Sequence, residues 1–167
     1  MRAFMTVVVI LANCITITNA QAGASASSTP NTLAAGARVS TNTISFTASD
    51  TGELGDTDTI TCTFDEKVFT SDGAMTTASV GTVVISESGT VATITTGIVV
   101  ANDDVFSTAI STNLDVNLAS GTAVGVECVS SEDIDPVSGT GYTVIAATAL
   151  TTGTTVVVPP TTMQPVD

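Results

Sequence analysis

Short runs in which apolar and β-branched residues alternate with polar ones fill the chain from Thr41 onward. Gly, Asp, Asn or Ser interrupts these runs about every 8–12 residues, as in β-sandwiches and barrels. A period of two is typical of a strand with one buried face, and no stretch shows the period of a helix. The pattern predicts one all-β domain of short antiparallel strands over residues 41–150.

The alternation also assigns one face of each expected strand to the core. Residues 81–86 and 89–96 are expected to pair as a hairpin around a turn at 87–88. The residues expected in the core are, strand by strand, Ile44, Phe46 and Ala48; Ile60, Cys62 and Phe64; Leu114, Val116 and Leu118; Val124, Val126 and Cys128; and Tyr142, Val144 and Ala146. The polar residues that alternate with the third of these groups, and are expected in solvent, are Asn113, Asp115 and Asn117.

The two flanks of this domain have a different composition. Met1 and Arg2 precede an apolar stretch that ends near small residues at 20–22, which is the order of a secretory signal peptide, so residues 1–22 are expected to be removed. That stretch is about 14 residues long, shorter than the roughly 20 of a spanning helix, so no membrane insertion is expected afterwards. Residues 23–40 are expected to be a flexible Ala/Ser/Thr-rich arm, and residues 151–167 a Thr/Val/Pro-rich strand or linker.

Two cysteines, Cys62 and Cys128, remain once the leader with Cys14 is removed. Both fall on apolar faces of expected strands, and an exported protein reaches an oxidising environment in which thiols pair. We expect these two cysteines to form a disulfide, with two buried free thiols as the alternative. Because the chain has few aromatic residues and no Trp to fill its core, the bond would matter for stability.

The segments that carry these cysteines resemble strands of the immunoglobulin family. Thr59-Ile60-Thr61-Cys62-Thr63-Phe64 is similar to the strand with the first cysteine, and Val124-Gly125-Val126-Glu127-Cys128-Val129 to the strand with the second. The chain has no core Trp, and Val126 stands where antibody domains have a Tyr. The resemblance implies an immunoglobulin-like antiparallel β-sandwich module of a secreted surface protein, with one inter-sheet disulfide.

The charge balance and the missing residue types exclude several functions. The chain has 16 acidic and 3 basic residues, and only Arg38 and Lys67 stay basic without the leader. Nucleic acid and anionic membranes are not expected as partners, because no basic patch can neutralise phosphates. The chain contains no His, which removes the commonest general base and most zinc sites, and it has one Tyr and no Trp to stack a sugar ring. No enzymatic activity is expected.

Acidic residues gather in the expected turns, and carboxylates are the ligands that Ca²⁺ prefers. Their spacing does not match an EF-hand, and acidic loops in solvent are the alternative interpretation. No obligatory cofactor is expected, and calcium is the candidate ion. Its candidate ligands are Asp56, Asp58, Glu132, Asp133 and Asp135.

These observations together predict a non-catalytic secreted structural or adhesive module, located outside the cell or on its surface, as the subunit of a filament or surface layer. The alternative is a calcium-assisted module that binds carbohydrate or another surface ligand. The expected partners are further copies of the chain, other extracellular proteins or glycans. The residues expected to add to the sheet edge of a neighbour are Thr154, Thr155, Val156, Val157 and Val158.

Overall fold

The computed structural model describes residues 23–148, except residues 71, 76–77, 112–113 and 134. The described chain is all-β, as the alternation predicts, and contains one short 3-10 turn, η1 (Glu87–Gly89). The strands are β1 (Ser25–Pro30), β2 (Asn42–Thr47), β3 (Thr59–Phe64), β4 (Gly73–Met75), β5 (Thr82–Ser86), β6 (Val91–Thr95), β7 (Val105–Ile110), β8 (Ala123–Ser130) and β9 (Val137–Thr143). The leader and the segment 154–158 lie outside the described residues.

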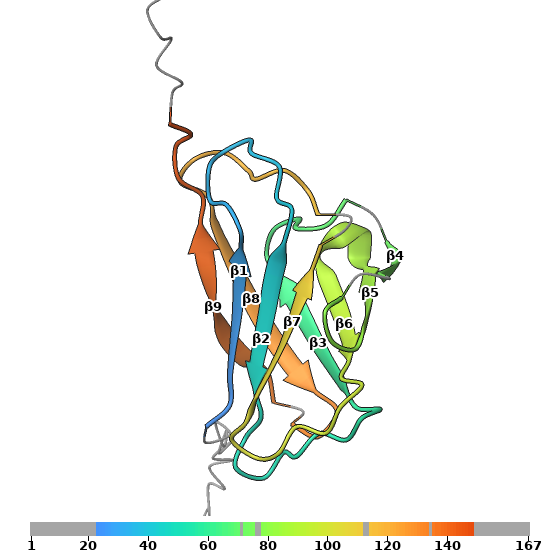
Figure 1. The fold of residues 1–167 in the computed structure, drawn as a ribbon. Coiled ribbons are helices and arrows are strands. Elements are labelled where there is room, and N and C mark those ends of the chain that lie inside the picture. Colours follow the sequence, from blue (N-terminus) through green and yellow to red (C-terminus); the bar gives the residue numbers. More distant parts are fainter. Residues whose placement is uncertain (1–22, 71, 76–77, 112–113, 134, 149–167) are drawn as a thin grey trace, which may run out of the picture.

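The strands form one nine-stranded sheet in the order β4-β5-β6-β3-β8-β9-β1-β2-β7. The sheet curls into a half-barrel, so that β1, β2 and β7 lie across from β3, β6 and β8 (Figure 1). All neighbouring strands are antiparallel except β1 and β9, which run parallel. The sequence predicts two separate sheets, whereas the described strands are continuous through β9.

Strand β9 is the corner at which the sheet turns. Its link to β1 is a single registered pair, Ser27 with Thr140. Its pairing with β8 is irregular between Val124 and Val126, and such irregularities bend a strand and increase its twist. Gly141 is required here, because a Cβ at this position would collide with the carbonyl oxygen of Val124. The glycines of β9 thus let three strands approach closely at the bend.

The core lies inside the curl and is filled by the faces that the alternation predicts. Phe46, Phe64 and Phe106 are buried, together with the aliphatic residues of β3, β5, β6 and β8. Strands β5 and β6 pair as the expected hairpin around η1. The predicted burial is confirmed for residues of β2, β3 and β8 and for Val144.

Three expectations are wrong in the described chain. Residues 25–30 of the expected flexible arm form β1, which pairs with β2 along its whole length. Leu114 is buried as expected and Asn113 lies outside the described residues, but residues 114–118 form no regular strand: Val116 is 51% exposed and Asn117 only 6%. The last strand begins at Val137 rather than at Tyr142, and Ala146 is exposed.

Candidate functional site

The two cysteines form the expected disulfide, but within the sheet rather than between sheets. Cys62 of β3 lies directly opposite Cys128 of β8, with a Cα–Cα distance of 4.1 Å. Both side chains are buried in the core. The predicted pairing is confirmed, and its inter-sheet placement is wrong because β3 and β8 are hydrogen-bonded neighbours. A buried disulfide is typical of proteins that fold in an oxidising compartment.

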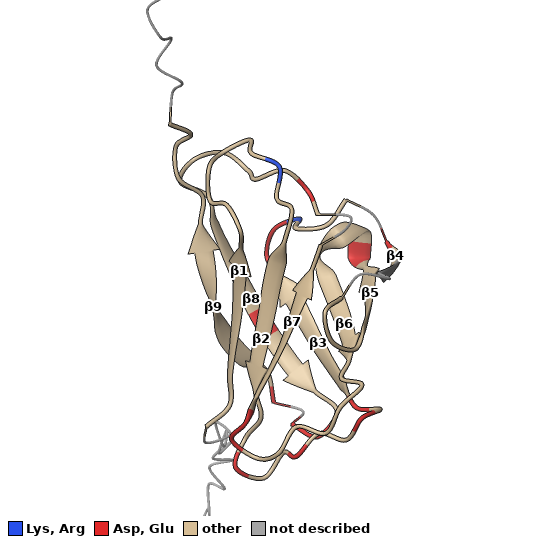
Figure 2. Cartoon of the chain, in the orientation of Figure 1, with Lys and Arg blue, Asp and Glu red and all other residues tan. Residues whose placement is uncertain are grey.

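One end of the molecule is acidic. The loops β2–β3, β6–β7 and β8–β9 meet at this end, which we call the acidic end, and their charged residues are all acidic (Figure 2). Ile98 and Val99, in the β6–β7 loop, are exposed there. The acidic residues of these loops are Asp50, Glu53, Asp56, Asp58, Asp103, Asp104, Glu132, Asp133 and Asp135.

Ser49 holds the three loops together. Its main-chain N–H and its hydroxyl donate to the carboxylate of Asp133, over 3.2 and 2.8 Å. Its carbonyl accepts the main-chain N–H groups of Gly52 and Asp103. Both Ser49 and Asp133 are buried, although they lie among charged loops. Hydrogen bonds therefore join the three loops of the acidic end to one another.

The proposed calcium ligands reach this end but do not converge. Asp58 accepts the N–H of Gly55 (2.6 Å), and Asp133 is buried against Ser49. Asp56, Glu132 and Asp135 are exposed. Among residues 23–148 outside the gaps, no group of three or more His, Cys, Asp or Glu side chains is close enough to hold a metal ion. Calcium binding stays a prediction.

The opposite end carries both basic residues of the described chain. Arg38 lies in the β1–β2 loop and is exposed. Lys67 forms an ion pair with Asp115 over 3.2 Å. Two aliphatic side chains, Val116 and Ile145, are also exposed here. We call this end the Arg38 end.

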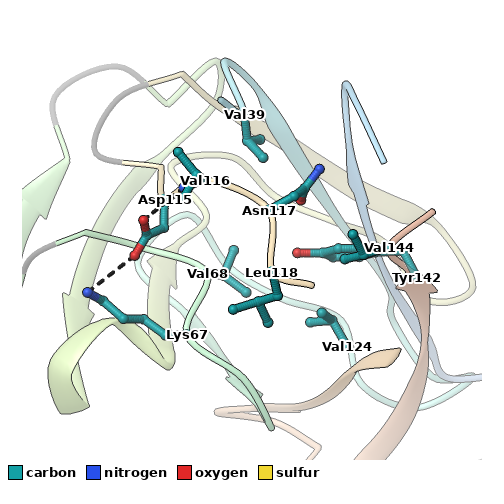
Figure 3. Close-up of a pocket in the computed structure, with 10 residues that line it drawn as sticks. All are labelled: Val39, Lys67, Val68, Asp115, Val116, Asn117, Leu118, Val124, Tyr142 and Val144. Atoms are coloured by element: carbon teal, nitrogen blue, oxygen red, sulfur yellow. Dashed lines mark hydrogen bonds and ion pairs between the residues drawn. The ribbon is translucent and has the colours of Figure 1, made fainter. Parts of the chain in front are cut away.

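A small cavity lies behind the Lys67–Asp115 pair (Figure 3). The side chains of Val68, Leu118 and Val124 converge on it, and Tyr142 borders it. Burial, and to a lesser degree the negative charge of Asp65, raise the pKa of the Tyr142 hydroxyl above its usual 10.0. The cavity volume of about 10 Å³ is near the minimum for one water molecule, so it does not fit an organic ligand.

The outer surface beside β9 has two open depressions of about 390 and 350 Å³. They share Asp65 and Gly125, whose carboxylate and N–H form a 2.7 Å hydrogen bond. Both depressions are shallow and open to solvent, whereas small-molecule sites are usually concave and enclose most of the ligand. They carry no functional assignment here.

Strand β7 is the last strand of the sheet, and its outer edge is only partly covered. Ser79 donates its N–H to the carbonyl of Ala109 (3.0 Å), and its hydroxyl accepts the N–H of Ala109 (2.8 Å). The main-chain groups of Ala109 therefore point away from β2. Along an antiparallel strand, the N–H and C=O of one residue point to one neighbouring strand and those of the next residue point to the other side. The main-chain groups of Val105 and Ser107 therefore point away from β2, like those of Ala109.

The start of β7 supports this assignment. The carbonyl of Asp104 faces β2, where it accepts the N–H of Ala48 (3.0 Å), as the alternation requires. Within the described part of the chain, no segment pairs with the outer edge of Val105 and Ser107. Both side chains are exposed. We call these main-chain groups the free β7 edge; the sequence could not reveal it, because pairing partners are set by topology.

No family model, curated protein or solved structure was found to match this chain. The described residues include no helix that is long and apolar enough to cross a membrane. The geometry of the two ends and of the free β7 edge is therefore the basis for assigning a function.

Proposed function

We propose that this protein is a non-catalytic, secreted structural or adhesive module whose copies join end to end in an extracellular filament or surface layer. The observation that carries the proposal is the position of the chain ends. The described chain begins at the acidic end and finishes at the Arg38 end (Figure 1). Successive copies that share one axis would bring the end of one chain next to the start of another.

Both ends also expose aliphatic side chains. Ile98 and Val99 are exposed at the acidic end, and Val116 and Ile145 at the Arg38 end. Arg38 forms no ion pair with the described residues. An end-to-end contact would remove these aliphatic side chains from water and bring Arg38 close to the exposed carboxylates at the acidic end of the next copy.

The buried disulfide and the strong excess of acidic residues support secretion. We also propose that the two halves of the sheet act as the two layers of an immunoglobulin-like sandwich. The single registered pair that links β1 to β9 supports this comparison, because little pairing joins the halves there.

Sedimentation velocity over a range of protein concentrations, with electron microscopy of the same samples, tests the proposal. We expect linear oligomers that grow with concentration. Val99→Ser, at the acidic end, should weaken association. Val84→Ser is the matched control, because Val84 is a similarly exposed valine on the outer face of β5. Arg38→Glu should weaken association and Arg38→Lys should preserve it. A protein that stays monomeric at every concentration, with and without calcium, would overturn the proposal.

A further inference from the structure

We infer that the free β7 edge is the acceptor for the segment 154–158 of a second copy of this chain, which adds to the sheet as one more strand. The inference rests on the proposed end-to-end assembly and names the contact that carries it. β-strand addition of this kind uses main-chain hydrogen bonds for affinity and side-chain fit for register.

The acceptor offers main-chain groups that no described segment of the chain pairs with. Val105 and Ser107 each present one N–H and one C=O, so up to four hydrogen bonds can form. Exposed edges are usually blocked by Lys, Pro or a bulge. The free β7 edge has none of these, and its Val105 side chain is 63% exposed.

The donor has the composition of a strand. Residues 154–158 read Thr-Thr-Val-Val-Val, all of them β-branched, and Pro159 and Pro160 follow, which cannot continue a paired central strand. Residues 149–166 contain no charged side chain. The segment can therefore approach the acidic end of a neighbour without repulsion from its carboxylates.

The position of the tail favours a second copy over the same chain. The described chain ends at the Arg38 end, whereas the free β7 edge lies where β7 begins, at the acidic end (Figure 1). The part of β7 nearer the Arg38 end is covered by Ser79, so the tail of the same chain would have to pass this covered part to reach Val105 and Ser107. In an end-to-end stack the end of the described chain lies next to the acidic end of the following copy.

Cysteine cross-linking between two different full-length proteins tests the contact. One protein carries Ser107→Cys, and the other carries Val156→Cys or Val157→Cys, which sample both faces of the donor strand. Mixed under mild oxidation, they should form a disulfide-linked heterodimer in one of the two combinations, because the Cα atoms of facing residues lie within disulfide range. The native disulfide is buried and should not exchange. Cross-linking that occurs only when both cysteines are on one chain would overturn the inference.

Variants on both sides of the contact give an independent measurement. Ser107→Pro removes an outward N–H without breaking the β2–β7 ladder, and Val157→Pro removes a donor N–H. Each should weaken association by about tenfold, near the upper range for one hydrogen bond. Val105→Lys should also weaken it. Matched controls are Thr161→Pro, beyond the segment, and Val84→Lys, away from the edge; both should associate normally. Peptide mapping of the native disulfide in each variant shows whether the fold is intact.

Truncation after Thr152 separates this inference from the proposed function. We expect a folded, disulfide-bonded monomer. If the truncated protein still forms linear oligomers, the inference fails while the proposed assembly stands. If the intact protein forms none, both fail. Loss of folding on truncation would show that the segment belongs to its own sheet, which also overturns the inference.

Discussion

Cys62 and Cys128 lie directly opposite each other on neighbouring strands, and their disulfide joins β3 to β8 inside the core. The bond closes a loop between residues 66 apart in the sequence, which contains β4 to β7. The disulfide therefore constrains a segment that contains both end strands of the sheet, β4 and β7.

The double variant Cys62→Ala/Cys128→Ala should be strongly destabilised. A loop of this length corresponds to about 4 kcal/mol in the chain-entropy account of disulfides, against about 5–15 kcal/mol for a typical domain. Urea unfolding followed by circular dichroism measures the change. An unfolding midpoint equal to that of the native protein would contradict the prediction.

In the β7–β8 loop, replacing Asn117 should destabilise the protein more than replacing Val116, which is the reverse of what the sequence alternation predicts. Asn117→Ala should cost about 1–3 kcal/mol, because its buried amide donates to the carbonyls of Thr32 (2.8 Å) and Ala34 (3.1 Å). Val116→Ala should change stability little, because Val116 is half exposed. Urea unfolding of both variants provides the comparison. A larger loss for Val116→Ala than for Asn117→Ala would show that the loop is packed the other way.

The sequence predicts the strand faces correctly where a strand pairs along its length, as in β2, β3 and β8. It fails at residues 114–118 because this loop crosses the Arg38 end and makes only isolated bridges. Asn117 therefore points inward, where its amide donates to a carbonyl of the β1–β2 loop. The sequence prediction also fails at β1, whose Ala and Ser residues have little hydrophobic signal. That strand forms because β2 and β9 flank it on both sides.

The candidate surfaces were only partly visible in the sequence. The acidic turns are plain in the sequence, yet their meeting at one end depends on which strands run in the same direction. The free β7 edge depends on strand order and on the cover by Ser79, neither of which a local pattern contains. The disulfide pairing could be predicted from the two apolar faces, but not its place between neighbouring strands.

The hydrogen bonds between Asp133 and Ser49 should be needed for the acidic end to keep its shape. Asp133→Ala leaves the buried N–H and hydroxyl of Ser49 without this carboxylate, which should cost about 1–3 kcal/mol. Gly52 packs directly against the Asp133 carboxylate, and amide hydrogen exchange in the loop at 49–52 should speed up in this variant. Glu132→Ala is the matched control, because Glu132 is exposed in the same loop. Equal exchange rates in the two variants would show that Asp133 does not anchor the loops.

The stability of the protein should fall in alkali through Tyr142. Burial, aided by Asp65, raises the pKa of this hydroxyl in the folded state above 10.0, so the folded protein holds the proton more tightly than the unfolded chain. The resulting stabilisation is complete below the unfolded pKa, about 10, and is lost as the pH rises through the folded pKa.

Tyr142 is the one Tyr of the chain, and there is no Trp, so the ultraviolet absorbance of the phenolate reports this residue alone. The titration midpoint should lie higher in native than in urea-unfolded protein, and Asp65→Asn should lower the native midpoint. Tyr142→Phe should remove this part of the alkaline destabilisation. Identical midpoints in native and unfolded protein would mean that Tyr142 is not buried beside the cavity.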